Sequence, residues 1–477
     1  MRYIAVDCGA GSVRIIVGGL LKGKVELDEI YRFSNNQIRL GNNVYWNFLT
    51  LFEEIKKGIG LAIRKYNDIV SIGVDTWGVD YGLLDENERL IGNPFSYRDR
   101  RTETIPEQVY KIIGQDDIYS VAGTQPMDIN TIFQLLSMHI ENSPQLKIAK
   151  HLLFMPDLIN YFLTGIKKSE YTIASTSSLL DAKTRNWSDE LLEALGLNAS
   201  LMCDVIFPGY LLGKVKKEIC QELGCDSLDV IAVGSHDTAS AAAITYTKHE
   251  NVAFLSSGTW SLIGTQIKKP ILNAEALQHN FTNEGGVNND ILFIKNLTGL
   301  WLVQRVLAQW KQEDGSEVDF EELITKAATC SPAQTCINTD DNAFINPDDM
   351  CATINAYCRN TGIPVPKTRA ETIRLLLESL AMKYKESIEL LQQITKKKIE
   401  KIHIVGGGCQ NELLNQLTSN YTGLPVMAGP VEATAMGNIL MQAIARKELK
   451  NIEEAEHLVA GSVSLKYYLP EKTVAYV

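Results

Sequence analysis

The sequence predicts an α/β protein in which one α/β unit is present twice. Short apolar strand patterns separated by glycine turns open the chain before an amphipathic helix, and a similar strand–turn–strand pattern returns in the second half. The length agrees with this prediction, because 477 residues, of which 45% are hydrophobic, suffice for about two to four domains of ordinary size.

The first 35 residues carry the pattern of three strands. Apolar residues cluster at 4–6 and 15–17 and alternate over 25–33, and glycines mark the turns at 9–11 and 18–23. Short glycine turns between successive strands favour hairpins. We therefore expect an antiparallel three-stranded meander at the start of the chain.

A helix and a buried strand complete the first unit. Over residues 47–66, apolar side chains recur at the three-to-four-residue spacing of one helix face. The apolar segment 71–74 follows and ends at the polar turn 75–78. The meander, the helix and this strand together make one compact α/β unit.

The second half of the chain repeats these features. The hairpin pattern 252–265 corresponds to the one that opens the chain, and the helix pattern 373–391 precedes a strand at 402–405 and a glycine triplet at 406–408. Duplication of one unit explains this recurrence. The boundary between the two units is then predicted near residues 244–251.

The charge balance excludes some classes of partner. Lys and Arg number 46 against 57 Asp and Glu, which gives a formal net charge of -11. Nucleic acids and anionic membrane surfaces require a basic footprint, so we expect neither as the main partner. No window approaches the roughly 18 apolar residues of a membrane span, and Asp7 interrupts any signal-peptide core. We therefore expect a cytoplasmic protein.

Two glycine patterns resemble nucleotide motifs but fail on context. Gly9 and Gly11 begin like a dinucleotide fingerprint, yet Arg14 stands where the third glycine belongs. The segment 18–24 fits the spacing of a P-loop, but Val25 replaces the required Ser or Thr. A strand rather than a helix follows each pattern, so we interpret both as hairpin glycines.

The cysteines and histidines do not form a recognisable metal motif. The nine Cys contain no C-x-x-C pair, and the seven His contain neither H-E-x-x-H nor a cluster at ligand spacing. We expect reduced thiols that serve mostly in packing, and no metal cage built from protein side chains alone.

Two glycine-containing hairpin turns, at 7–10 and 256–259, stand at equivalent places in the two units. Backbone N–H groups in such turns can bind phosphate oxygens, so we expect both loops to contact one polyphosphate. Asp7 adds a carboxylate that is suited to Mg²⁺ held through its waters. The alternative is that Asp7 caps a tight turn, and the residues alone leave both interpretations open.

Asp237 is the candidate catalytic carboxylate. The apolar strand pattern 230–233 leads through residues 234–238 into the small-residue helix 239–243. A carboxylate after the carboxyl end of a strand in an α/β sheet is well placed to act on a bound substrate. The alternative is that Asp237 caps the following helix, which does not exclude catalysis.

At these residues the chain resembles the FGGY family of carbohydrate kinases. The similar blocks follow the order of the family from residue 5 to about 440, and together they are specific although each alone is weak. They are Ala5–Ala10, Gly73–Asp80, Tyr97–Asp99, Gly234–Ser240, Ser256–Ser261, Lys295–Gln304 and Gly406–Asn411.

The resemblance implies two actin-like (ribonuclease-H-like) domains with the active site in the cleft between them. We expect an N-terminal domain at 1–245, with the sugar site, the first phosphate hairpin and the catalytic Asp, and an ATP-binding domain at 246–477. Within the family, the blocks are similar to those of enzymes that use ATP and Mg²⁺ to phosphorylate L-rhamnulose at its 1-hydroxyl in L-rhamnose breakdown. The expected partners are thus a sugar and ATP.

The resemblance also assigns site residues. Asp237 is expected as the general base, and the expected sugar contacts are Gly78, His236, Asp237, Thr238 and Asn296. The expected ATP contacts are Ala10, Gly11, Ser12, Val13, Arg14, Thr259, Gln304 and Gly407. One residue departs from the family pattern, because Val13 stands where the first loop usually has glycine. Val13 cannot visit positive φ freely, and Gly11 is the neighbour that can compensate.

Two further segments carry open interpretations. Asp75 and Asp80 flank Trp77 and Gly78, a turn that either faces the sugar or is purely structural. The cationic segment 97–101 is interpreted as a solvated, salt-bridged loop in preference to a docking site for the sugar or its phosphate.

Two alternative functions remain from the sequence. The first is a kinase for another ketose, such as fuculose or xylulose, because pocket contacts decide among sugar hydroxyls. The second is an actin-like ATPase that acts as a chaperone or filament subunit, since fold does not determine function.

Overall fold

The computed structural model describes residues 1–245, 251–333, 335–345 and 347–471. The chain separates by contacts into two compact units. Unit 1 comprises Met1–Lys248, Gln266–Phe293 and Ala433–Ser462, and unit 2 comprises His249–Thr265, Ile294–Glu432 and Val463–Val477. The boundary expected near residues 244–251 falls largely on 246–250, outside the described residues. The division into domains 1–245 and 246–477 therefore stays a prediction.

Unit 1 is built on a six-stranded sheet in the order β13-β14-β6-β1-β2-β3. Its strands are β1 (Arg2–Cys8), β2 (Ser12–Leu21), β3 (Lys24–Ser34), β6 (Ile69–Thr76), β13 (Leu211–Lys214) and β14 (Asp229–Ile231). β1, β2 and β3 pair antiparallel, which confirms the predicted meander. β1, β6 and β14 run parallel, so their carboxyl ends meet at one edge of the sheet.

Helix α1 (Phe48–Lys65) confirms the helix predicted over 47–66. Asn47 caps the start of the helix by accepting a hydrogen bond from the Thr50 N–H at 3.3 Å. Arg64 and Lys65 lie in the last turn, where positive charges interact favourably with the helix dipole. Its apolar face enters a core that helices α6 (Met155–Thr164) and α9 (Lys217–Leu223) also line. This core fixes the strands that carry the site.

The remaining elements of unit 1 are mostly short. The strands are β4 (Gln37–Leu40), β5 (Asn43–Trp46), β7 (Tyr81–Leu84), β8 (His151–Phe154), β9 (Ser169–Glu170), β10 (Leu180–Asp181), β11 (Asn186–Trp187), β12 (Val205–Ile206) and β17 (Phe281–Gly285). The helices are α2 (Ile105–Val109), α3 (Gln115–Ala122), α4 (Thr131–Ile140), α5 (Pro144–Ile148), α7 (Tyr171–Ala174), α8 (Asp189–Ala194), α10 (Asp237–Ala243), α11 (Ala274–Gln278), α17 (Ala433–Ala445) and α18 (Ile452–Ser462). Helices α3, α4, α7 and α8 surround a second apolar core.

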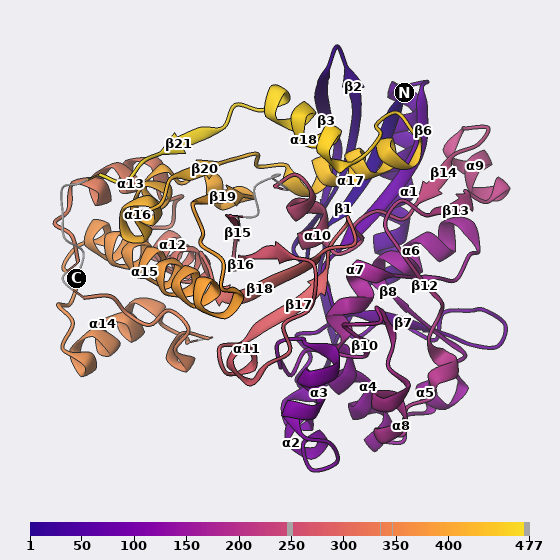
Figure 1. Ribbon diagram of the computed structural model, residues 1–477, viewed down its shortest axis with the longest axis horizontal. Helices are drawn as coiled ribbons and strands as arrows, with labels where there is room; N and C mark the ends of the chain where they lie inside the picture. The colour runs from indigo at the N-terminus through magenta and orange to yellow at the C-terminus, as the bar shows by residue number, and fades with distance from the viewer. Residues whose placement is uncertain (246–250, 334, 346, 472–477) are drawn as a thin grey trace. The chain divides into compact units, whose positions relative to one another are not determined.

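Helix α17 packs closely against α10 and the β1–β6 pair within unit 1 (Figure 1). An added Cβ at Gly437 would lie 1.9 Å from the carbonyl oxygen of Ser240 on α10. The same helix fastens the sheet through polar groups, because the Gln442 amide donates to the Ile4 carbonyl at 2.9 Å and accepts from the Ser71 hydroxyl at 2.7 Å. Small residues on α10 and α17 therefore set how closely these helices approach.

The second sheet has the order β17-β18-β16-β15-β19-β20-β21. Its further strands are β15 (Val252–Ser257), β16 (Trp260–Ile267), β18 (Ile291–Thr298), β19 (Lys401–Val405), β20 (Val426–Ala428) and β21 (Lys466–Tyr468). β15 pairs antiparallel with β16 and parallel with β19, as β1 does with β2 and β6. This equivalence confirms the duplication inferred from the repeated hairpin.

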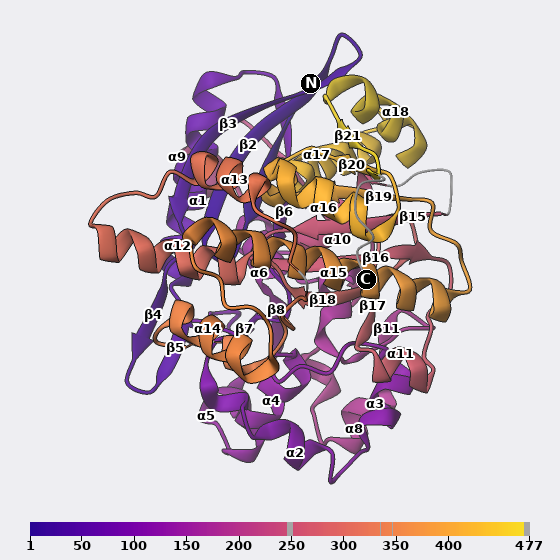
Figure 2. The same ribbon diagram turned by 90° about the vertical axis from the view of Figure 1, so that its left-hand side faces the viewer.

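The helices of unit 2 are α12 (Trp301–Asp314), α13 (Phe320–Thr329), α14 (Met350–Thr361), α15 (Arg369–Thr395) and α16 (Glu412–Thr422). α15 contains the helix predicted at 373–391, and a capping box between Thr368 and Glu371 begins it. Figure 2 shows α15 beside α16, and the two helices are in contact. No helix among the described residues is long and apolar enough to cross a membrane.

We predict that Gly437→Ala destabilises unit 1, because the new methyl group must push α17 away from the backbone of α10. Such overpacking costs about 1–3 kcal/mol, measurable as a lower midpoint of urea denaturation. Gly461→Ala on α18 is the matched control, since an added Cβ there meets nothing within 4 Å. It should leave stability unchanged or raise it by up to about 1 kcal/mol. Equal midpoints for the two variants would contradict the prediction.

Candidate active site

The first glycine turn connects β1 to β2 and is held by backbone hydrogen bonds. The Gly9 N–H donates to the Ser12 carbonyl at 2.9 Å, and the Asn35 side chain donates to the Gly9 carbonyl at 3.0 Å. Val13 lies opposite Cys8 within the strand pair, and its side chain is fully buried. Strand conformation suits any residue, so this position does not need the freedom of glycine, and only the backbone of Val13 can contact a ligand.

Two carboxylates lie side by side at the ends of β1 and β6. Asp7 and Asp75 are partners in the parallel register, and Asp7 forms an ion pair with Arg14 on β2. One oxygen of Asp75 accepts a hydrogen bond from the Asn438 amide at 2.6 Å, whereas Oδ1 is buried with no hydrogen-bond partner among the described residues. Burial raises the pKa of both carboxyls. The charge of Asp7 raises the pKa of Asp75 further, whereas the Arg14 guanidinium opposes the rise at Asp7.

These carboxylates fit the preferences of Mg²⁺, which needs only one or two of them when phosphate oxygens and water complete its shell. The unpartnered Oδ1 of Asp75 beside Asp7 is an oxygen that such an ion could satisfy. No group of three or more His, Cys, Asp or Glu side chains that could hold a metal occurs in the described part of the chain.

Asp237 is the first residue of α10, directly after the segment that leaves β14. His236, not Asp237, occupies the N-cap position, so the interpretation of Asp237 as the helix cap is wrong by one residue. The Asp237 carboxylate accepts a hydrogen bond from the Thr238 hydroxyl at 3.2 Å and remains 34% exposed. Burial of its surroundings raises the pKa of Asp237, and the nearby His236 charge opposes that rise.

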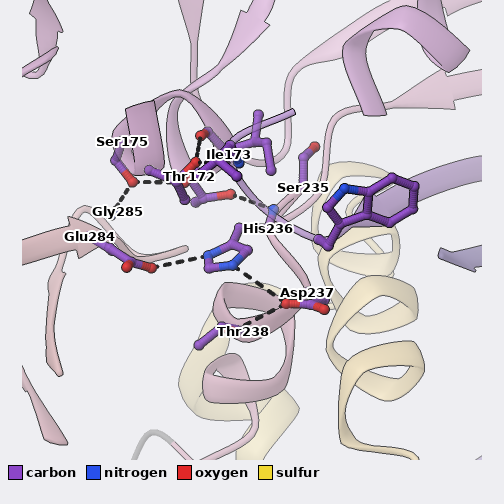
Figure 3. A network of polar contacts seen from close by, with 12 residues as sticks. Thr172, Ile173, Ser175, Ser235, His236, Asp237, Thr238, Glu284 and Gly285 are labelled. Atoms are coloured by element: carbon purple, nitrogen blue, oxygen red, sulfur yellow. Dashed lines mark hydrogen bonds and ion pairs between the residues drawn. The ribbon is translucent and has the colours of Figure 1, made fainter. Parts of the chain in front are cut away.

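The imidazole of His236 lies between two carboxylates (Figure 3). Its Nδ1 is 3.1 Å from Oε2 of Glu284, and its Nε2 is 3.5 Å from Oδ1 of Asp237. Burial lowers the pKa of His236, but Glu284 and the charge of Asp237 raise it, and the net direction is upward. Sequence reasoning missed Glu284, because the short strand β17 that carries it is mostly polar in sequence although every residue of it is buried in the structure.

Glu170 and Thr172 form a buried support beneath this group. The Glu170 carboxylate caps α7 by accepting the N–H groups of Thr172 and Ile173, and it accepts the Ser235 N–H at 3.2 Å. The Thr172 hydroxyl accepts a hydrogen bond from the backbone N–H of His236 at 3.1 Å. Burial, opposed by these hydrogen bonds, raises the pKa of Glu170 to about 7. Sequence reasoning missed both residues, which lie far from Asp237 in the sequence.

The turn at Gly78 is strained and firmly held. Val79 adopts φ of 67°, an uncommon conformation for a β-branched residue. The Thr176 hydroxyl accepts the Val79 N–H at 3.0 Å, and an added Cβ at Gly78 would meet Thr176 at 3.2 Å. Asp80 fixes the far side of the turn by accepting the Trp77 indole N–H at 3.0 Å. Strained backbone that is held in place by several surrounding hydrogen bonds is typical of functional sites.

The cationic segment 97–101 is only partly solvated. Asp99 is buried and accepts the Val44 N–H at 2.6 Å, while Arg101 donates to the Gln134 carbonyl at 3.1 Å. Arg98 and Arg100 are exposed. The segment is therefore anchored at Asp99 and Arg101 and presents its other arginines to solvent.

The remaining predicted ligand residues belong to unit 2. The Thr259 hydroxyl donates to the Gln304 side chain at 3.0 Å, which brings these two predicted ATP contacts together. An added Cβ at Gly299 would lie 2.6 Å from the Gly258 carbonyl, so the start of α12 can approach the turn only with glycine there. Gly407 is exposed at the start of a 3₁₀ turn, and Asn296 is half-buried on β18.

Comparisons with known proteins agree for both halves of the chain. Models of the FGGY family of carbohydrate kinases match residues 2–243 with the N-terminal domain and 253–446 with the C-terminal domain. The chain is 41% identical to a rhamnulokinase of Bacteroides thetaiotaomicron, covering 100% of this chain and 97% of the relative. It is 39% identical to a rhamnulokinase of Bacillus subtilis, covering 99% and 96%.

Solved structures share the fold at low identity. A gluconate kinase from Lactobacillus acidophilus superposes with a TM-score of 0.82 at 16% identity, covering 98% of this chain and 94% of that one. A glycerol kinase from Plasmodium falciparum with ADP gives 0.80 at 15% identity and the same coverage. These likenesses confirm the mixed α/β two-domain fold.

We predict that Glu170 makes stability fall as pH rises. Its folded pKa of about 7 exceeds the ordinary value of 4.5, so the folded state holds the proton more tightly. The contribution of Glu170 to stability is fully present below about pH 4.5 and is lost, by up to about 3 kcal/mol, as pH rises through 7. Glu170→Gln should remove this contribution, measured as the free energy of unfolding from pH 5 to 8.

Glu190→Gln, at an exposed position in the first turn of α8, is the control and should follow the unchanged protein. An identical pH slope in the Glu170→Gln protein would contradict the assignment.

Proposed function

The chain belongs to the FGGY family of carbohydrate kinases, and we propose that it transfers the γ-phosphoryl group of ATP to the 1-hydroxyl of L-rhamnulose. Kinases of this family use ATP as the phosphoryl donor. The observation that carries the sugar assignment is the match, over nearly the full length of both chains, to relatives named rhamnulokinase.

Asp237 is the proposed general base. In phosphoryl transfer the protein mainly positions the reactants and balances charge. The Asp237 carboxylate is partly exposed at the start of α10, where it can hydrogen-bond the primary hydroxyl of the sugar and accept its proton. Its raised pKa supports this role, because a base works best when its pKa approaches the working pH.

The sugar contacts are proposed at Gly78, His236, Thr238 and Asn296. Thr238 and His236 both flank the Asp237 carboxylate, so a hydroxyl bound to that carboxylate would lie near both side chains. The strained, firmly held turn at Gly78 and Val79 supports a role in presenting backbone groups to the sugar.

The nucleotide contacts are proposed at the two hairpin turns. Ala10, Gly11, Ser12 and Arg14 would meet ATP in the first turn, with Val13 contributing only its backbone. Thr259, Gln304 and Gly407 are the proposed contacts in unit 2. Asp7, with Asp75 beside it, would hold Mg²⁺ together with phosphate oxygens. Bound Mg²⁺ supplies positive charge that offsets the phosphates, and Arg14 adds its own.

We predict that L-rhamnulose gives the highest kcat/KM in a panel that also contains L-fuculose and D-xylulose, with ADP release as the readout. A site that hydrogen-bonds particular hydroxyls should prefer the correct ketose by about 100-fold or more. The control omits the sugar and measures hydrolysis alone. Preference for another ketose would overturn the sugar assignment, and ADP release at the same rate without sugar would overturn the kinase role.

A further inference from the structure

The imidazole of His236 is enclosed by carboxylates on both of its ring nitrogens. Glu284 faces Nδ1 from β17, and Asp237 faces Nε2 from α10 (Figure 3). Only 8% of His236 and 7% of Glu284 are exposed, so the contact between the ring and Glu284 is shielded from solvent. The function proposed above assigns no role to Glu284, although this carboxylate lies beside a residue proposed to contact the sugar.

We propose that Glu284 is a positioning residue for phosphoryl transfer, which holds the His236 ring as an imidazolium with Nε2 directed at the catalytic Asp237. The inference rests on the proposed function, because its effect on turnover assumes that Asp237 is the base. Glu284 itself is buried and acts through His236 rather than on the substrate.

The protonation state follows from the geometry. A neutral imidazole donates from one ring nitrogen and offers a lone pair from the other. With carboxylate oxygens 3.1 Å from Nδ1 and 3.5 Å from Nε2, either neutral tautomer would turn a lone pair towards a negative oxygen. The imidazolium carries an N–H on each ring nitrogen and turns positive charge towards both carboxylates. The contacts are close ion pairs, since neither Nδ1 of His236 nor Oε2 of Glu284 meets the geometry of a hydrogen bond among the described residues. The ring therefore needs Glu284 to offset the cost of a buried positive charge.

The charges around His236 agree with this state. Burial lowers the pKa of His236, whereas the contact with Glu284 and the charges of Glu284, Asp237 and Glu170 raise it, with an upward net direction. Glu284 and Asp237 contact the ring from β17 and α10, and Glu170, the N-cap residue of α7, acts on it through its charge. The imidazolium in turn lowers the pKa of Asp237 and so favours the ionised base.

A rigid support fixes Glu284 in place. The Gly285 N–H donates to the Ser175 hydroxyl at 2.7 Å, and that hydroxyl donates to the Thr172 carbonyl at 2.7 Å. The Thr172 hydroxyl also accepts a hydrogen bond from the backbone N–H of His236. The backbone segments that carry Glu284 and His236 are therefore both attached to α7. An added Cβ at Gly285 would lie 2.7 Å from the Tyr171 ring, so β17 approaches α7 only because this residue is glycine.

The direct test is NMR of the imidazole nitrogens in the full-length protein without substrate. We expect both nitrogens of His236 to be protonated at pH 7, and Glu284→Gln to lower its pKa so that one nitrogen loses its proton. His236→Asn assigns the signal. His403 is the internal control, because it is buried against the Gly429 carbonyl and should not respond. An unchanged His236 titration in Glu284→Gln would overturn the proposal.

The kinetic test separates positioning from folding. Misplacing a reacting group by about 1 Å costs up to about 100-fold, so we expect Glu284→Gln to lower kcat/KM by about 10- to 100-fold. The imidazolium of His236 is present below the pKa of the ring and lost above it. Because Glu284→Gln should lower that pKa, the alkaline limb of its kcat/KM profile should move to lower pH. Glu284→Asp keeps the charge and should restore part of both effects; it also serves if Glu284→Gln fails to fold.

Glu378→Gln is the matched control, since Glu378 is a fully buried carboxylate paired with Arg374 in unit 2. It should lower stability without moving the pH profile. A Glu284→Gln protein that loses stability but keeps the pH profile would assign Glu284 a merely structural role and overturn the proposal. The NMR readout needs no sugar, so it stands apart from any failure of the L-rhamnulose assignment.

Discussion

The parallel register of β1 and β6 places the carboxylates of Asp7 and Asp75 side by side in a buried position. Neighbouring strands lie about 4.8 Å apart, so ionised carboxylates on paired residues repel each other. Burial and the charge of Asp7 accordingly raise the pKa of Asp75 well above its ordinary value. Arg14 and Asn438 offset part of this cost through an ion pair and a hydrogen bond. Buried acids in this arrangement oppose folding, and we propose that their role is to hold Mg²⁺ beside the phosphates of the nucleotide.

The position of Asp237 is likewise fixed by buried contacts. Its segment leaves the sheet at β14 and is fastened on one side to α7, through Glu170 and Thr172, and on the other to α17, through the close approach at Gly437. Because these supports are buried and short, the carboxylate at the start of α10 has little freedom. Close packing and buried hydrogen bonds therefore hold the partly exposed carboxylate of Asp237 in place.

Local patterns predicted most of the framework, because strands, turns and amphipathic helices depend on residues close in sequence. The meander, α1 and the repeated hairpin follow from such patterns. Glu170 and Glu284 escaped prediction, since their importance arises only when distant segments meet at His236. The helix-cap interpretation of Asp237 was wrong by one residue because helix ends are poorly specified by sequence. The assignment of ATP contacts rests on resemblance and stays a prediction.

The central claim is that Asp237 accepts the proton of the attacking sugar hydroxyl. The most direct measurement is kcat of Asp237→Asn under saturating ATP and sugar, with substrate binding and the urea midpoint measured on the same sample. Loss of a general base predicts a fall of about 100- to 10,000-fold with folding and binding retained. Asp204→Asn, at an exposed aspartate in the same unit, should keep normal turnover. Near-normal turnover in a folded, substrate-binding Asp237→Asn protein would contradict the claim.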